Sequence, residues 1–305
     1  MNSVRVMLMV SLAGLALVLP AGCRRPLASP VSYSTSNVAV LRTALVGNAS
    51  ASESAAAVIA DPMGWATLKG VFKMVGSPPP RSKLNVDKEQ SICLPGGKPV
   101  LDEVVVVDPA TGGIKDVVIF LETKYPLDNP KWEHPDYAAT KNAEVVFDQK
   151  ACVFLTHVFA IRSTQTLKVL NSDPTGHNMK IDGGPRPDNF SVAAGASLPY
   201  TPGGEAAEPF PVSCSIHTWM SAYGLVRQSP YFAVTNAQGE FELKNLPAGV
   251  PLKFRVWQER AKFLKDVAAT GTIDKFNKGR LELRLDNDEQ RQLELSVESK
   301  LFGGN

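Results

Sequence analysis

The chain has 305 residues and a formal net charge of +2, with 32 Lys and Arg residues against 30 Asp and Glu residues. This length accommodates about two domains, and a balanced charge without a basic block argues against a nucleic-acid-binding protein. The 23 prolines and 23 glycines favour short strands and turns over a helical bundle, so we expect an all-β protein.

The N-terminus has the features of an export signal. Arg5 gives a positive start, and residues 6–19 form an apolar run that is too short to span a bilayer comfortably. The run ends at Cys23 in a stretch similar to the lipobox of bacterial lipoproteins, although Pro20 stands where that box carries an aliphatic residue. We predict a signal peptide over residues 1–23, lipidation of Cys23 and a membrane-anchored protein of the periplasm or cell envelope. Ordinary signal cleavage is the alternative.

Two segments separate this signal from the middle of the chain. Residues 24–61 are rich in Ala, Ser and Val with little charge, which is typical of a flexible tether. Residues 62–142 are interpreted as an N-terminal β segment, with a strand near residues 64–74 and a strand pair at 104–107 and 117–121. They end in a proline-containing excursion that includes His134, for which we expect no metal-binding role.

Residues 143–229 have the pattern of a small β-sandwich. Residues 152–162 alternate in period two and predict one long strand that contains His157. Further strands are expected at residues 189–192, 197–200, 208–212 and 223–227, and strands at this spacing are typical of a sandwich.

Three potential metal ligands follow one another within this region, as Cys-x2-His-x2-Met at Cys214, His217 and Met220. A thiolate, an imidazole and a weak thioether suit copper when one more imidazole joins them. His177, about 40 residues earlier at the end of a strand-like run, is the obvious candidate, and His157 is its rival. Structural zinc is disfavoured because a thioether is a poor zinc ligand, and a cysteine nucleophile is disfavoured because no third residue orients a His base.

This region resembles the cupredoxin family of type 1 blue copper proteins, and its ligand spacing is most similar to that of amicyanins. The resemblance implies a Greek-key β-sandwich holding one copper ion. It makes His177, Cys214 and His217 the equatorial ligands and Met220 the axial ligand. It also gives Asn178 the role of bracing the ligand loop through hydrogen bonds.

The resemblance implies a one-electron carrier that is not an enzyme. Electrons would leave through the edge of His217, next to an apolar docking patch of Ile216, Trp219 and Pro211, toward an unknown redox partner protein of the cell envelope. A copper enzyme is disfavoured because the chain has four His residues and no His-x-His pair. The alternative is an envelope protein that binds a partner or carbohydrate and in which copper is structural or stored.

The four cysteines divide by chemistry. With Cys23 assigned to lipid and Cys214 to metal, Cys93 and Cys152 remain, and an oxidising compartment favours a disulfide between them. Two free buried thiols are the alternative, since sequence does not show whether the two residues approach each other.

Residues 230–305 differ in character from residues 143–229, which we call the copper-like region. They resemble the carboxypeptidase regulatory-like β-sandwich, with Thr235, Gly239 and Phe241 in its Thr-x3-Gly-x-Phe hairpin and a Leu-Pro-x-Gly turn after it. We expect a second, smaller β-sandwich here. Residues 64–122 offer strands that would complete it around the copper domain, and a plain N-to-C pair of domains is the alternative.

Overall fold

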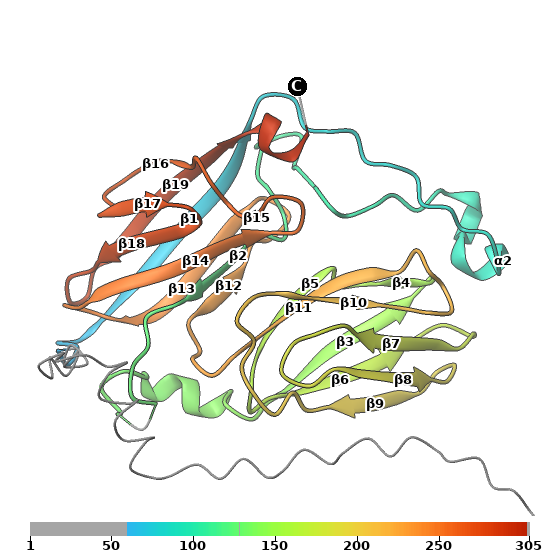
Figure 1. Cartoon of the computed structure of the whole chain (residues 1–305), viewed down its shortest axis with the longest axis horizontal. Helices are drawn as coiled ribbons and strands as arrows, with labels where there is room; N and C mark the ends of the chain where they lie inside the picture. The colour runs from blue at the N-terminus through green and yellow to red at the C-terminus, as the bar shows by residue number, and fades with distance from the viewer. Residues whose placement is uncertain (1–59, 128, 304–305) are drawn as a thin grey trace, which may run out of the picture. The chain divides into compact units, whose positions relative to one another are not determined.

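The computed structural model describes residues 60–127 and 129–303 (Figure 1). The predicted signal peptide, Cys23 and almost all of the expected tether lie outside the described residues. Within the described ranges nearly every regular element is a strand, which confirms the all-β expectation. No helix in this part of the chain is long and apolar enough to cross a membrane.

The copper-like region forms a sandwich of two sheets, ordered β4-β3-β6-β9 and β5-β11-β10-β7-β8. Along β6 every second residue is buried, as expected for a strand with one face in the core. Phe147, Leu167 and Tyr200 are among the fully buried residues of this core. The strands are β3 (Glu144–Lys150), β4 (Val153–Phe154), β5 (Val158–Arg162), β6 (Thr166–Asn171), β7 (His177–Ile181), β8 (Asp188–Val192), β9 (Ser197–Tyr200), β10 (Phe210–Ser213) and β11 (Ser221–Arg227).

The prediction of one long strand over residues 152–162 is wrong. β4 pairs with β3 in one sheet, whereas β5 pairs with β11 in the other, so the chain crosses the sandwich between them. Leu155 N donates to Asp148 O on one side of this crossing, and His157 O accepts from Tyr223 N on the other. Period-two alternation does not reveal such a crossing, because the pattern continues in both strands.

The second sandwich combines strands from both ends of the described chain. Its sheets are ordered β13-β1-β19-β16 and β12-β2-β14-β18-β17, with β15 beside β14. β1 and β2 precede the copper-like region, and all their partners follow it. The elements are β1 (Trp65–Val75), β2 (Val118–Leu121), β12 (Phe232–Val234), β13 (Glu240–Pro247), β14 (Pro251–Gln258), β15 (Lys262–Phe263), β16 (Ala268–Thr270), β17 (Lys275–Asn277), β18 (Arg280–Arg284), β19 (Gln290–Glu298) and the 3-10 helix η3 (Ser299–Phe302).

The Thr-x3-Gly-x-Phe motif follows the copper-like region, and it packs against the part of the second sandwich that precedes that region. The buried Thr235 hydroxyl donates to Ile114 O at 2.7 Å and accepts from Val117 N at 2.8 Å. Gly239 has φ +77°, and a Cβ there would lie 2.5 Å from Phe72 O, so only glycine fits. The motif therefore has a packing role that does not depend on any family resemblance.

The expectation of a strand at residues 104–107 is wrong. Residues 104–107 form no strand apart from an isolated bridge between Val107 and Ile114. After β14 the chain makes a tight turn into β15, in which the side chain of Gln258 accepts hydrogen bonds from the backbone of Arg260 and Ala261. The helical elements before β3 are α2 (Gln90–Cys93), η1 (Pro95–Gly97) and η2 (Pro135–Ala139).

Candidate metal centre

Strand pairing brings the potential ligands together at one end of a sheet. His177 is the first residue of β7, and β7 pairs with β10. β10 in turn pairs with β11, and residues 214–220 form the loop between these two strands. The loop is therefore held beside the start of β7, although His177 and Cys214 are far apart in the sequence.

Three of the predicted ligands converge in the interior. Ligand atoms of His177, Cys214 and His217 all lie within 4.8 Å of one another. The Nδ1 atoms of the two histidines are 2.8 Å apart. His177 is 1 % exposed, Cys214 2 % and His217 0 %, so any ion among these atoms would be shielded from water by the protein.

Both imidazoles present their Nε2 atoms to carboxylates on the outer side. His177 Nε2 lies 2.8 Å from Asp173 Oδ2, and His217 Nε2 lies 2.8 Å from Glu89 Oε2. An ionised carboxylate only accepts hydrogen bonds, so each Nε2 carries a proton and each ring turns the lone pair of its Nδ1 inward. Two lone pairs 2.8 Å apart, with a sulfur beside them, need a cation between them. That cation is either a proton or a metal ion.

The ionisation of the cluster agrees with this arrangement. Burial raises the pKa of the Cys214 thiol, but hydrogen bonds from His177 and from the backbone of Asn178, His217 and Ile216 hold the pKa below its usual value. Burial lowers the pKa of His177, but the Cys214 sulfur and the Asp173 carboxylate raise it above its usual value overall. Both shifts favour a Cys214 thiolate beside a protonated His177, and a metal ion would bind in place of that proton.

Asn178 holds the ligand loop from the neighbouring strand. Its Oδ1 accepts from Ser215 N at 2.7 Å and from Ile216 N at 3.2 Å, and it lies 3.3 Å from Cys214 Sγ. Its backbone N–H faces Cys214 Sγ at 3.5 Å, and His217 N faces the same sulfur at 3.3 Å. These contacts fix the position of the sulfur and place hydrogen-bond donors around it.

Met220, the expected axial ligand, closes the same loop. Its backbone N donates to His217 O at 2.9 Å, and its O accepts from Cys214 N at 3.3 Å. Its side chain is 1 % exposed and packs in the core of the copper-like sandwich. The loop is thus closed on itself by its own backbone, and the Met220 side chain is buried.

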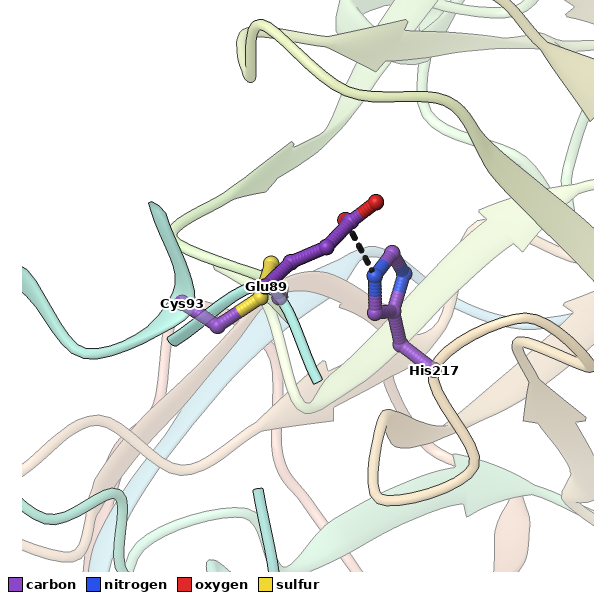
Figure 2. A group of neighbouring side chains, drawn as sticks. Glu89, Cys93 and His217 are labelled. Carbon is purple, nitrogen blue, oxygen red and sulfur yellow. Dashed lines mark hydrogen bonds and ion pairs between the residues drawn. A yellow bond between two sulfur atoms is a disulfide. The ribbon is translucent and has the colours of Figure 1, made fainter. Parts of the chain in front are cut away.

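The expectation that His217 offers an edge near solvent is wrong. His217 has no exposed surface, because Glu89 covers its outer nitrogen (Figure 2). Trp219 is also buried, and its Nε1 donates to Cys152 O at 3.0 Å. Of the expected docking patch only Ile216 and Pro211 remain exposed.

Sequence reasoning missed Asp173 and Glu89. Asp173 lies four residues before His177, and its carboxylate also accepts from Ala151 N at 2.6 Å and Cys152 N at 2.8 Å. The short distance to His177 in the sequence was the one available signal for Asp173. Glu89 is 128 residues from His217, and no local pattern indicates their contact.

Cys93 and Cys152 form a disulfide. Cys93 ends α2, and Cys152 lies in the two-residue turn between β3 and β4, where Ala151 and Cys152 both have φ +53°. The bond therefore attaches the segment that carries Glu89 to the copper-like sandwich, beside the cluster of His177, Cys214 and His217.

Removing this disulfide should lower the free energy of unfolding by about 2 to 4 kcal/mol, because a cross-link between residues separated by about 60 positions restricts the unfolded chain. The double variant Cys93→Ser, Cys152→Ser is compared with wild type by urea unfolding. Wild type treated with a thiol reductant should lose a similar amount. Equal unfolding midpoints for the bridged and unbridged proteins would contradict the prediction.

The other two histidines lie in different surroundings. His134 accepts a hydrogen bond from Asp136 N at 3.2 Å. His157, the rival ligand, is buried, and its Nε2 lies 2.6 Å from Glu259 Oε2. Neither belongs to a ligand cluster within the described part of the chain, so His157 has a structural partner rather than a metal-binding neighbourhood.

The His157–Glu259 pair should make stability depend on pH. Burial lowers the pKa of His157, but the hydrogen bond and charge of Glu259, with the charges of Asp116 and Glu103, raise it above its usual value overall. The pair's contribution is therefore complete below the unfolded pKa of about 6.5 and is lost as pH rises through the folded pKa. Urea unfolding at about pH 6 and about pH 9 should show wild type losing more stability than His157→Gln over this interval. Glu259→Gln should remove the same dependence, and an excess stability of wild type that grows with pH would contradict the prediction.

Comparisons with known proteins give distant structural similarity. No family model and no curated protein matches the chain. A copper-containing nitrite reductase from Thermus scotoductus aligns at 20 % identity over 27 % of this chain and 22 % of the reductase, with a TM-score of 0.26. An amicyanin from Paracoccus versutus aligns at 19 % identity over 36 % of this chain and 97 % of the amicyanin, with a TM-score of 0.25. This chain thus spans about a fifth of the reductase, and at these scores the alignments add nothing to the geometry of the centre.

Proposed function

We propose that the protein binds one copper ion at His177, Cys214, His217 and Met220 and acts as a one-electron carrier rather than as an enzyme. The observation that supports this most directly is the inward orientation of the two histidines. Their Nδ1 atoms are 2.8 Å apart, next to a buried sulfur, and their outer nitrogens are held by carboxylates.

The donor set fits copper better than the common alternatives. Two imidazoles and a thiolate, with a methionine in the same loop, are soft and borderline donors that suit copper. Calcium and magnesium prefer oxygen donors, and structural zinc prefers four Cys and His ligands. Bound copper would supply a change between Cu(II) and Cu(I), which transfers one electron.

The contribution of the chain is to hold this set in place. Asp173 and Glu89 fix the two rings, and Asn178 fixes the sulfur, so the ligands are positioned before a metal arrives. A site that is already formed needs little rearrangement when the charge of its ion changes by one unit. The dry interior also keeps water from the ligand atoms, since His177, Cys214 and His217 are almost completely buried.

A spectrum of the purified protein loaded with Cu(II) tests the proposal. A Cu(II)–thiolate bond gives intense visible absorption and a characteristic paramagnetic resonance signal, and a reversible one-electron wave in voltammetry is expected of a carrier. A protein that binds Cu(II) without colour, or that does not bind it, would rule out the proposed function.

A second candidate is a binding protein in which copper is structural or stored. The complete burial of His217 favours it, because a carrier must exchange electrons with a partner. Voltammetry separates the two functions: stored copper should exchange electrons with small reagents only slowly, whereas a carrier should do so rapidly and reversibly.

The cellular setting is part of the proposal. The signal and lipobox-like features of residues 1–23 support a membrane-anchored lipoprotein of the periplasm or cell envelope, and a disulfide is compatible with that oxidising compartment. The partner would then be a redox protein of the same compartment.

A further inference from the structure

Residues 81–102, which we name the cap, precede the copper-like sandwich and cover the cluster of His177, Cys214 and His217. Its two arms run antiparallel, with Leu84 N donating to Val100 O and Asp102 N donating to Ser82 O, both at 2.9 Å. Its tip is α2, and Val86 and Cys93 pack in the core of the copper-like sandwich. The cap is therefore part of the packed structure around the cluster.

Glu89 lies immediately before α2 at the tip of the cap. Its backbone has φ +48°, a left-handed conformation that a residue with a Cβ rarely adopts. The strain is maintained by the disulfide at the other end of α2 and by the packing of the cap. Such strain is commonly found where a side chain must point at a functional group.

The Glu89 carboxylate reaches from the cap to the outer nitrogen of His217 (Figure 2). Oε2 lies 2.8 Å from His217 Nε2, and the Glu89 side chain is 40 % exposed while the imidazole is fully buried. Thr175, two residues before His177, also hydrogen-bonds to this carboxylate. Glu89 therefore lies between His217 and solvent.

We infer that Glu89 is a positioning residue that holds the His217 ring with its Nδ1 lone pair toward Cys214 and His177, and that its negative charge favours the oxidised metal. Asp173 holds His177 in the same way from within the sandwich. A carboxylate on the far nitrogen of a ligating histidine fixes the tautomer and increases the basicity of the metal-facing nitrogen. The charge attracts Cu(II) more strongly than Cu(I), so it should lower the reduction potential.

This inference rests on the proposed copper function for its electronic part, while its positioning part concerns the apoprotein as well. Two substitutions separate the parts. Glu89→Gln keeps an oxygen that accepts a hydrogen bond but removes the charge, whereas Glu89→Ala removes both and opens the ring to water. Asp87→Asn is the matched control, because it removes an exposed carboxylate from the same cap without a contact to His217.

In the copper-loaded protein, Glu89→Gln should lower the affinity for Cu(II) relative to Cu(I) by about tenfold. For one electron this corresponds to a rise in reduction potential of about 59 mV, and Asp87→Asn should leave the potential near the wild-type value. In the apoprotein, nitrogen-15 spectra should show a protected Nε2–H on His217 in wild type and in Glu89→Gln, and rapid exchange of that proton with water in Glu89→Ala.

The outcomes distinguish the two proposals. If wild type binds copper but the Glu89 variants match Asp87→Asn in potential and in proton exchange, the positioning role is wrong and the copper function stands. If wild type does not bind copper, the proposed function fails, and the exchange experiment on the apoprotein still decides whether Glu89 holds His217.

Discussion

Replacing Cys214 with serine should abolish the visible absorption of the copper-loaded protein and lower its Cu(II) affinity by more than about 100-fold. The hydroxyl of serine is a poor donor for copper and is not ionised at neutral pH. The sulfur also accepts from the backbone of Asn178 and His217, so the variant changes the centre of the ligand set. Titration with Cu(II), followed by absorbance and paramagnetic resonance, measures both effects.

Two comparison variants make this test specific. Met220→Leu should retain colour and binding, because an axial thioether bonds weakly, but it should raise the reduction potential. His157→Ala should leave the spectrum unchanged, since His157 pairs with Glu259. Retention of the intense absorption in Cys214→Ser, or its loss in His157→Ala, would mean that the ligands have been assigned to the wrong residues.

Asp173→Asn should lower the free energy of unfolding by about 3 kcal/mol and the Cu(II) affinity by about 10- to 100-fold. The buried carboxylate accepts hydrogen bonds from Ala151 N, Cys152 N and His177 Nε2. An asparagine side chain has one oxygen in place of two and would turn an amide N–H toward at least one of these donors. The substitution therefore weakens the turn that carries the disulfide and releases the His177 ring at the same time.

Urea unfolding of the apoprotein and copper titration measure these two losses separately. Asp182→Asn is the matched control, since Asp182 pairs with Lys180 at the surface, where an ion pair contributes little. If Asp173→Asn and Asp182→Asn behave alike, Asp173 does not have the supporting role that its contacts imply.

The three residues that converge in the cluster could be predicted from the sequence, but the carboxylates on its outer side could not. Cys214, His217 and Met220 share one short loop, and the donor chemistry of that loop restricts the choice of metal. His177 could be added because it follows a strand-like run. Glu89 could not, because its contact depends on how residues 81–102 fold back over a sandwich that begins more than 40 residues later.

The strands of the fold could likewise be predicted only in part. Strands such as β1 and β9 were expected close to their observed bounds. Residues 104–107 have strand-like composition but lie between connecting segments, and among the described residues they pair only through one bridge. The break between β4 and β5 is set by which sheet each strand joins, and that choice is made by tertiary packing.

The pairing of β1 and β2 with late strands has a consequence for how the chain folds. Val71 of β1 lies beside Glu294 of β19, and Phe120 of β2 lies beside Arg255 of β14. As the chain is made from its N-terminus, the copper-like sandwich between these segments can close while β1 and β2 still expose unpaired edges. Contacts over such long sequence separations form slowly, and unpaired strand edges are prone to aggregation. A chain that stops after β11 would contain all four proposed ligands and yet leave two hydrophobic strands without partners.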